Sequence, residues 1–235
     1  MTKITIVFDN YAWLEGFKTL WGFSCFVEAP EITFLFDTGS NGRFLLKNMA
    51  RLGVDPKRAE SLVISHRHWD HIGGIDSVLE VHPDLRLYLP ASLSKHLIRD
   101  LEDLSGGVTI VGKEPTAILP GVVSTGIMGE IGEQSAVIPT PEGLVVITGC
   151  AHPGVANIAE RAVEMTGEPI ALLMGGFHLM YSNEEEIAAV IERLQELGVR
   201  RVCPTHCSGD LAIGMFAQAF REGFVPGGIG KVIEL

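Results

Sequence analysis

The 235-residue sequence has no long hydrophobic run, little positive charge and few cysteines. No apolar segment approaches the ~20 residues that a transmembrane helix needs, so we expect no membrane partner. The 18 basic residues are outnumbered by 29 acidic ones, and a net charge of −11 argues against binding to a phosphate backbone, so no nucleic-acid partner is expected. The four cysteines form no C-x-x-C pair, and the first ten residues lack a signal-peptide pattern. Both features favour the cytoplasm.

Short β-rich runs alternate with helical patterns along the chain, without a linker or a low-complexity segment. The patterns predict strands over residues 4–8, 23–28, 32–36, 61–65, 121–124, 136–139, 144–148, 170–174 and 201–204. They predict helices over residues 44–52, 91–101, 153–166 and 211–220, and one that starts at Ser182 with a capping box to Glu185. Because the strands come in hairpin-like groups as well as strand–helix units, we expect an α/β fold with two sheets and outer helices. Residues 1–235 are expected to form a single domain.

The strongest chemical signal is the run SHRHWDHIGG, which directly follows a predicted buried strand. His66, His68, Asp70 and His71 place four potential metal ligands within six residues. Imidazole and carboxylate groups are ligands that zinc, iron and manganese accept. In an extended segment His66 and His68 point the same way, and a turn can then bring the other two ligands close. The H-x-H-x-D-H run therefore predicts a metal site.

This run is similar to the metal signature of the metallo-β-lactamase superfamily. The resemblance implies a four-layered αββα sandwich with a metal centre at the edge between the two sheets. It also implies two sets of ligands: His66, His68 and His152 for the first metal, and Asp70, His71 and His206 for the second. The FDTG stretch resembles the upstream aspartate motif of the superfamily, and we expect Asp37 to orient ligands by hydrogen bonds.

Five segments together resemble one branch of that superfamily, named for the dihydropterin–ribofuranosylaminobenzene 5′-phosphate synthase. They are Asp9-Asn10, WGFS from Trp21, GCAHPG from Gly149, GGFHL from Gly175 and HCSG from His206. The set identifies the branch better than it identifies the substrate, since one fold hosts many reactions.

One ligand of the superfamily pattern is missing. Most two-metal members carry a bridging aspartate after the strand that corresponds to residues 170–174, but a glycine pair follows it here. We therefore expect a weakly bound second ion, and one or two ions per chain. His178 lies near this position and is expected to face the substrate, with metal ligation or simple packing as alternatives. Cys150 and Cys207 adjoin proposed ligands and are interpreted as ordinary buried cysteines, with thiolate ligation as the alternative.

The leading hypothesis is a metal-dependent hydrolase that acts on a phosphorylated or other ester-type small molecule. Its expected cofactors are one or two divalent transition-metal ions. Zinc is expected first, with iron or manganese as alternatives. In this hypothesis Asp70 orients the attacking hydroxide, while His178 protonates the leaving group or binds phosphate. Arg67 is a candidate contact for an anionic substrate. The alternatives are a synthase that joins a pterin diphosphate to a ribofuranosylaminobenzene phosphate, and a non-catalytic metal-binding protein.

Overall fold

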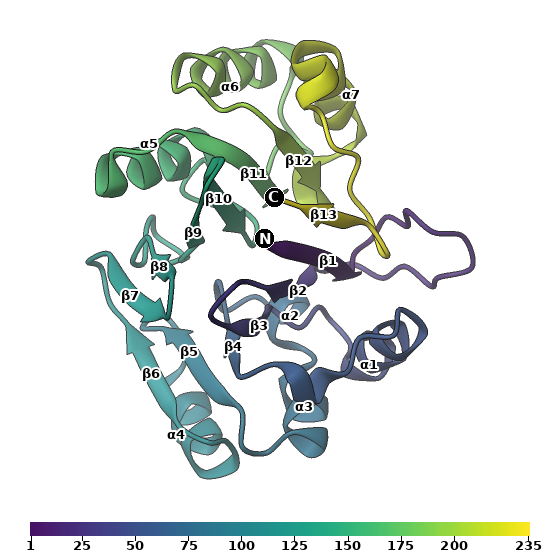
Figure 1. Cartoon of the computed structure of the whole chain (residues 1–235), viewed down its shortest axis with the longest axis vertical. Helices are drawn as coiled ribbons and strands as arrows, with labels where there is room; N and C mark the ends of the chain where they lie inside the picture. The colour runs from purple at the N-terminus through teal and green to yellow at the C-terminus, as the bar shows by residue number, and fades with distance from the viewer.

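The computed structural model describes residues 1–235 and arranges them as two β-sheets between two layers of helices (Figure 1). The seven-stranded sheet contains, in spatial order, β13 (Val232–Glu234), β1 (Lys3–Phe8), β2 (Ser24–Glu28), β3 (Thr33–Phe36), β4 (Ser61–Val63), β5 (Arg86–Pro90) and β6 (Val108–Val111). The six-stranded sheet contains β12 (Val202–Thr205), β11 (Ile170–Gly176), β10 (Gly143–Thr148), β9 (Ala136–Thr140), β8 (Val122–Ser124) and β7 (Thr116–Leu119). The expected four-layered αββα sandwich is confirmed.

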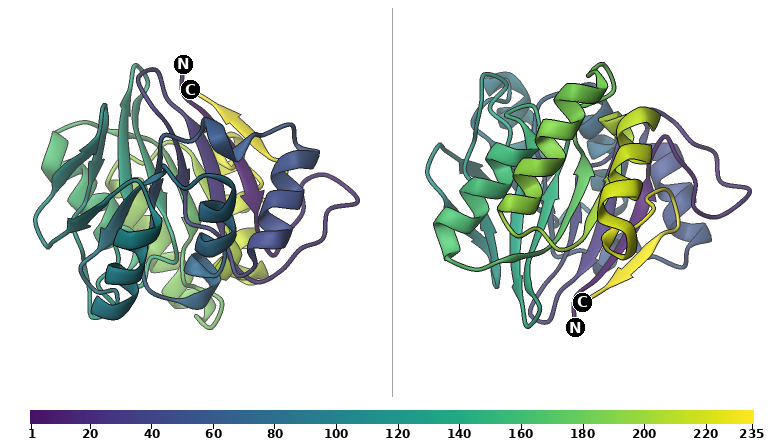
Figure 2. Two further views of the ribbon diagram at one scale, coloured as in Figure 1. Left: turned by 90° about the horizontal axis from the view of Figure 1, so that it is seen from below. Right: turned by 90° about the horizontal axis from the view of Figure 1, so that it is seen from above.

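Helices cover the outer face of each sheet, as Figure 2 shows from two sides. The seven-stranded sheet is covered by α1 (Gly42–Arg51), α3 (Ile75–Val81) and α4 (Lys95–Leu104). The six-stranded sheet is covered by α5 (Val155–Thr166), α6 (Glu184–Glu196) and α7 (Asp210–Phe220). The four-residue helix α2 (Trp69–Ile72) lies within the histidine-rich segment instead. None of these helices is long and apolar enough to cross a bilayer.

Three hydrophobic clusters correspond to the three interfaces between these four layers. The largest contains 24 buried residues and fills the space between the sheets, where Phe36 and Val63 of one sheet meet Ile147 and Met174 of the other. A second cluster joins α5, α6 and α7 to the six-stranded sheet, and a third joins α1, α3 and α4 to the seven-stranded sheet. Burial of apolar surface at all three interfaces holds the layers together.

Three predicted helices begin later in the structure than the sequence indicated. The helix expected over residues 91–101 is α4, which starts after the cap Ser94, whose side chain accepts a hydrogen bond from the His96 amide. The helix expected from residue 153 starts at Val155, after Gly154 in a left-handed backbone conformation. The capping box of α6 joins Asn183 to Glu186, so the pairing of Ser182 with Glu185 was wrong.

Four strands were not predicted: β5, β6, β7 and β13. β6, β7 and β13 each lie at the outer edge of a sheet and expose one or more side chains. β5 lies inside the seven-stranded sheet, between β4 and β6.

The pairing of the strands positions the site. β3, β4 and β5 run parallel within one sheet, as do β10, β11 and β12 within the other. The carboxyl ends of parallel strands lie at one edge of a sheet, and loops at that edge commonly form binding sites. The predicted site residues follow β3, β4, β10, β11 and β12, so the fold gathers them between the two sheets.

Candidate metal centre

The first set of histidines forms a regular triangle. The ring centroids of His66, His68 and His152 are 4.7 Å apart in each of the three pairs. The Nε2 atom of His66 lies 3.1 Å from Nδ1 of His68, and the nearest ligand atoms of all three residues lie within 4.8 Å of one another. The structure therefore brings together the three ligands expected for a first metal.

Hydrogen bonds fix which nitrogen each buried imidazole turns toward the centre. The Nδ1 atom of His152 donates to Glu133 Oε2 at 2.7 Å, and Nδ1 of His66 donates to the Ser65 hydroxyl at 2.9 Å. That hydroxyl in turn donates to Asp37 Oδ2 at 2.6 Å. With Nδ1 engaged, Nε2 of each histidine presents a lone pair, which is the usual arrangement around a metal ion.

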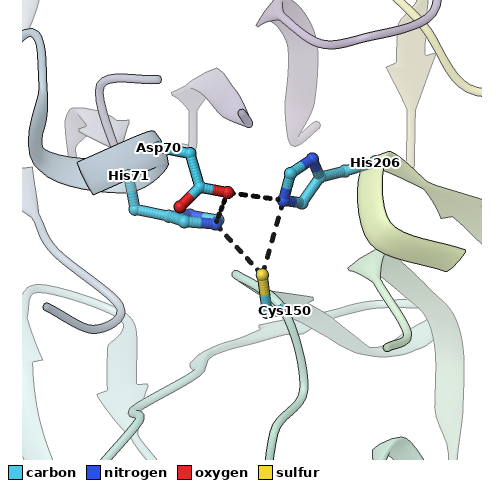
Figure 3. A group of neighbouring side chains, drawn as sticks. All are labelled: Asp70, His71, Cys150 and His206. Carbon is cyan, nitrogen blue, oxygen red and sulfur yellow. Dashed lines mark hydrogen bonds and ion pairs between the residues drawn. The ribbon is translucent and has the colours of Figure 1, made fainter. Parts of the chain in front are cut away.

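The second set is held in the same way. Nδ1 of His71 donates to Asp37 Oδ2 at 2.7 Å, and Nδ1 of His206 donates to the Asn10 side-chain oxygen at 2.8 Å. Figure 3 shows the two Nε2 atoms, a carboxylate oxygen of Asp70 and the sulfur of Cys150 turned toward one point. Asp70 Oδ2 lies 3.6 Å from His71 Nε2 and 3.3 Å from His206 Nε2.

Asp37 lies where the sequence resemblance indicated and links the two sets. It is fully buried and also accepts a hydrogen bond from the Ser65 amide at 2.7 Å. Burial raises the pKa of Asp37 to about 7, while the charge of His66 and the two bonds from Ser65 oppose that rise. One carboxylate thus orients His71 directly and His66 through a hydroxyl.

The donor chemistry fits a divalent transition metal. Burial lowers the pKa of His66 and of His71 to about 3, so both imidazoles are neutral at pH 7. Neutral imidazole is the form that ligates metals. The donor atoms of each set lie within 4.8 Å of one another, so one ion could contact all of them. Zinc, iron and manganese all accept this combination of nitrogen and oxygen donors.

Backbone strain is concentrated at the same place. Four of the five non-glycine residues with positive φ are Asp37 (56°), Ala151 (61°), His178 (54°) and His206 (53°). Such conformations cost about 1–3 kcal/mol each and persist only where the surroundings impose them. Here they turn the chain at the strand ends so that the side chains converge.

A cavity of about 320 Å³ opens onto the centre. His178 lines it, and its ring centroid lies 4.4 Å from that of His152. A hydrogen bond with Cys207 raises the pKa of His178. Arg67, in contrast, is exposed and is not among the residues that line the cavity. The proposed contact of Arg67 with an anionic substrate stays a prediction.

Three residues of the site were not assigned a role in it from the sequence. Glu133 is fully buried in the β8–β9 loop, and its carboxylate also accepts from the amides of Cys150, Ala151 and His152 at 2.8–2.9 Å. Asn10, in a segment that resembles the synthase branch, holds His206 from the far end of the chain. Cys150, interpreted as an ordinary buried cysteine, lies among the second set of ligands.

The family model of the metallo-β-lactamase superfamily matches residues 22–206. With the αββα fold and the histidine-rich centre, this match shows that the chain belongs to the metallo-β-lactamase superfamily.

Two relatives cover nearly the whole chain. The 7,8-dihydropterin-6-methyl-4-(β-D-ribofuranosyl)-aminobenzene-5′-phosphate synthase of Methanocaldococcus jannaschii is 27% identical over an alignment that covers 99% of this chain and 96% of that protein. The crystal structure of Tm1679, described as a metal-dependent hydrolase of the β-lactamase superfamily, is 29% identical, with a TM-score of 0.83 and coverage of 100% and 99%. The resemblance to the synthase branch is therefore confirmed along the chain.

A more distant structure shares the fold. The metallo-β-lactamase fold protein YhfI from Bacillus subtilis is 15% identical, with a TM-score of 0.72 and full coverage of both chains.

Proposed function

We propose that this chain is a metal-dependent hydrolase acting on a phosphorylated or other ester-type small molecule. The observation that carries the proposal is the convergence of two ligand sets whose imidazoles are oriented by buried hydrogen bonds. Superfamily membership and the similarity to a protein described as a metal-dependent hydrolase support it. Such extensive preorganisation also argues against a non-catalytic metal-binding role, since a catalytic centre needs ligands held on rigid elements.

The proposed metals are one or two divalent ions, with zinc the first candidate. His66, His68 and His152 would hold the first ion, and three protein ligands leave the open position that catalytic zinc sites keep. An ion bound there lowers the pKa of a water molecule toward neutrality and polarises the electrophile. Its positive charge would also attract an anionic substrate, because the local field of a bound ion outweighs the net charge of −11.

His178 and Asp70 are the proposed catalytic side chains. His178 lies beside His152 on the wall of the cavity, within reach of a substrate that occupies it. The bond with Cys207 that raises its pKa favours the protonated imidazole, which can donate to a leaving-group oxygen or bind phosphate. Asp70 also lines the cavity, and its carboxylate can orient the attacking nucleophile by accepting a hydrogen bond from it.

The synthase reaction is the second candidate, since the relative with that name matches 99% of the chain. There the same ligand sets would act on a pterin diphosphate, with a ribofuranosylaminobenzene phosphate as the nucleophile in place of water. The two reactions differ in their need for this second substrate. A hydrolase releases product from a single substrate and water, whereas the synthase releases diphosphate only when both substrates are present.

The first test is elemental analysis of the purified protein, where between one and two transition-metal ions per chain are expected. A panel of phosphodiesters, phosphomonoesters and lactones then tests hydrolysis, with the metal-free protein as control. Absence of bound metal, with none taken up on titration, would overturn the metal-centre proposal. Metal without hydrolysis of any panel member, together with diphosphate release from the paired pterin substrates, would establish the synthase instead.

A further inference from the structure

The sulfur of Cys150 lies against both imidazoles of the second ligand set (Figure 3). Its Sγ atom is 3.1 Å from His71 Nε2 and 3.4 Å from His206 Nε2. The Asp70 oxygen that faces the same two nitrogens completes a group of four donor atoms, all within 4.8 Å of one another.

These distances match a tetrahedral metal site. Zinc–nitrogen and zinc–oxygen bonds of about 2.0–2.1 Å, with a zinc–sulfur bond of about 2.3 Å, place tetrahedral neighbours about 3.3 Å apart for nitrogen and oxygen and about 3.6 Å apart for sulfur and nitrogen. The four separations between Asp70 or Cys150 and the two histidines span 3.1–3.6 Å. The sulfur therefore stands where a fourth ligand belongs.

The glycine pair at the end of β11 explains how the sulfur of Cys150 reaches this position. A Cβ atom on Gly176 would lie 2.6 Å from the sulfur of Cys207, 2.6 Å from the carbonyl oxygen of Gly149 and 3.1 Å from the Cα of Cys150. The strand end thus packs directly against the turn that carries Cys150. No side chain fits at residue 176, and the close packing brings Cys150 to the centre from the neighbouring strand β10.

We propose that the Cys150 thiolate is the fourth protein ligand of the second metal ion and replaces the carboxylate that the end of β11 lacks. With Asp70 it gives the site two negative charges, which balance a divalent cation. Four protein ligands are typical of closed zinc sites, so the open position belongs to the first set of histidines. This proposal implies that the second ion is bound tightly, whereas the sequence led us to expect a weakly bound second ion. It rests on the metal centre of the proposed function but not on the reaction.

Cobalt(II) substitution tests this assignment without a substrate. Wild-type protein loaded with two equivalents of Co²⁺ should show a strong thiolate-to-cobalt charge-transfer band in the near ultraviolet. In Cys150→Ser the band should be absent, and the second equivalent should be lost at chelator concentrations that leave it bound to the wild type. Retention of the first equivalent in that variant shows that the protein is folded. Cys207→Ser is the matched control, because Cys207 is a second buried thiol at the same cavity, and it should keep the band.

The outcomes separate this inference from the proposed function. Two bound Co²⁺ ions without a thiolate band would overturn the role of Cys150 and leave the metal centre intact. Loss of the band in Cys207→Ser, with retention in Cys150→Ser, would show that Cys207 is the ligand and would overturn the assignment of Cys150. Failure of the wild-type protein to take up any metal would overturn the proposed function itself.

A second, independent observation concerns the mouth of the cavity, where large side chains are exposed. Trp21, Trp69, Met180 and Tyr181 line the cavity beside the metal-centre residues. Trp69 is 62% exposed and Tyr181 is 90% exposed. The chain has only three tryptophans, and two of them are at this mouth. Exposed apolar side chains that cluster around a polar cavity indicate a binding surface, whereas single exposed apolar side chains do not.

From this arrangement we infer that the mouth binds a planar aromatic ring carried by the substrate, while the anionic group of the substrate reaches the metal centre. Aromatic rings provide a large flat contact area and gain about 0.5–1.5 kcal/mol from stacking beyond the burial of surface. Trp69 and Tyr181 line the same cavity as His68 and His178. The rings therefore stand next to the residues that would meet the anionic group. This inference deepens the proposed function by naming a substrate class.

Binding of non-cleavable phosphonates to the metal-loaded protein tests the inference. Phenylphosphonate should bind about three- to tenfold more tightly than cyclohexylphosphonate, which has the same number of ring carbons, as measured by calorimetry. Trp69→Ala should remove most of that preference, and Trp13→Ala should keep it, since Trp13 is 47% exposed but does not line the cavity. Equal binding of the two phosphonates by the wild-type protein would overturn the inference. Tight, selective binding of the aromatic phosphonate, without hydrolysis of any ester in the substrate panel, would refute the hydrolase and leave the aromatic mouth intact.

Discussion

Replacement of Glu133 by glutamine should weaken the fold and the first metal site together. The Glu133 carboxylate is fully buried and accepts four hydrogen bonds from one short segment. Oε1 accepts from the amides of Cys150 and Ala151, both at 2.8 Å, and Oε2 accepts from the amide and the Nδ1 of His152, at 2.9 and 2.7 Å. Although burial alone raises its pKa, the hydrogen bonds from His152 and the charge of His66 lower the pKa of Glu133 below its usual range.

The size of the stability loss follows from the number of N–H donors that lose their acceptor. A glutamine side chain keeps one acceptor oxygen and replaces the other with an NH₂ group. In either orientation of the amide, two N–H donors face this NH₂ group and lose their acceptor. Each unsatisfied buried donor costs about 1–3 kcal/mol, so the free energy of unfolding of the metal-free protein should fall by about 2–6 kcal/mol. Because the four bonds together hold the segment that carries His152, first-site metal affinity should also fall by about 10- to 100-fold.

Urea titration of the metal-free protein and chelator competition of the loaded protein measure these two losses. Glu130→Gln is the matched control, because Glu130 is exposed in the same loop and the same charge is removed. We expect the Glu130 variant to behave like the wild type. Equal unfolding midpoints and equal metal affinities for Glu133→Gln and wild type would refute the reasoning that this carboxylate organises the loop of the third ligand.

Four further predictions follow from the same geometry. His66→Ala or His152→Ala should empty the first site and abolish activity; elemental analysis showing full metal content would contradict this. Asp37→Ala should weaken metal affinity by about 10- to 100-fold in a chelator competition, and unchanged affinity would exclude its orienting role. His178→Ala should keep its metal but lower kcat by about 10²–10⁴-fold; loss of one ion would instead make His178 a ligand. Asp37→Asn should make the stability of the metal-free protein fall more steeply between pH 7 and pH 4. Burial lowers the pKa of His66 and His71 to about 3, so protonation of the unfolded chain destabilises the fold in this window, whereas burial raises the pKa of Asp37 to about 7 and opposes that loss. Equal slopes of the urea midpoint against pH in this variant and the wild type would contradict this last expectation.

The sequence predicts most strands inside the sheets, but it misses β5 and three strands at the edges. The strand run at residues 61–65 and the run at 144–148 are apolar because both of their faces are covered, so their pattern is strong. β6, β7 and β13 each lie at a sheet edge and carry exposed side chains, which removes the apolar pattern. Such strands are held by pairing with a neighbour that the local sequence does not reveal.

The start of α6 shows why helix boundaries are difficult to predict. Ser182 with Glu185 and Asn183 with Glu186 both match the capping-box pattern. In the structure the Ser182 amide donates to the carbonyl oxygen of Leu179, which closes a turn and moves the helix start to the next residue. The choice between two equivalent caps depends on the preceding loop rather than on the caps themselves.

The candidate site was predictable where its residues are adjacent and not where the fold joins distant segments. H-x-H-x-D-H is visible because four ligands occur within six residues. Glu133 reaches His152 from 19 residues away, and Asn10 reaches His206 across 196 residues. Neither is part of a ligand pattern, and the only signal was the Asp9-Asn10 pair among the branch-like segments. Cys150 was named beside its neighbouring ligand, but only the packing of the glycine pair shows where its sulfur lies.

The orienting partners also couple the metal centre to the fold as a whole. His206 depends on Asn10 after β1, His71 depends on Asp37 after β3, and His152 depends on a carboxylate from the β8–β9 loop. Each imidazole is therefore fixed by an element other than its own. Four residues of the centre hold strained positive-φ conformations, at about 1–3 kcal/mol each, which these bonds must offset. Since a bound ion stabilises only the arrangement in which all its ligands converge, metal binding should stabilise both sheets at once, and chelation should lower the temperature of global unfolding rather than loosen one loop.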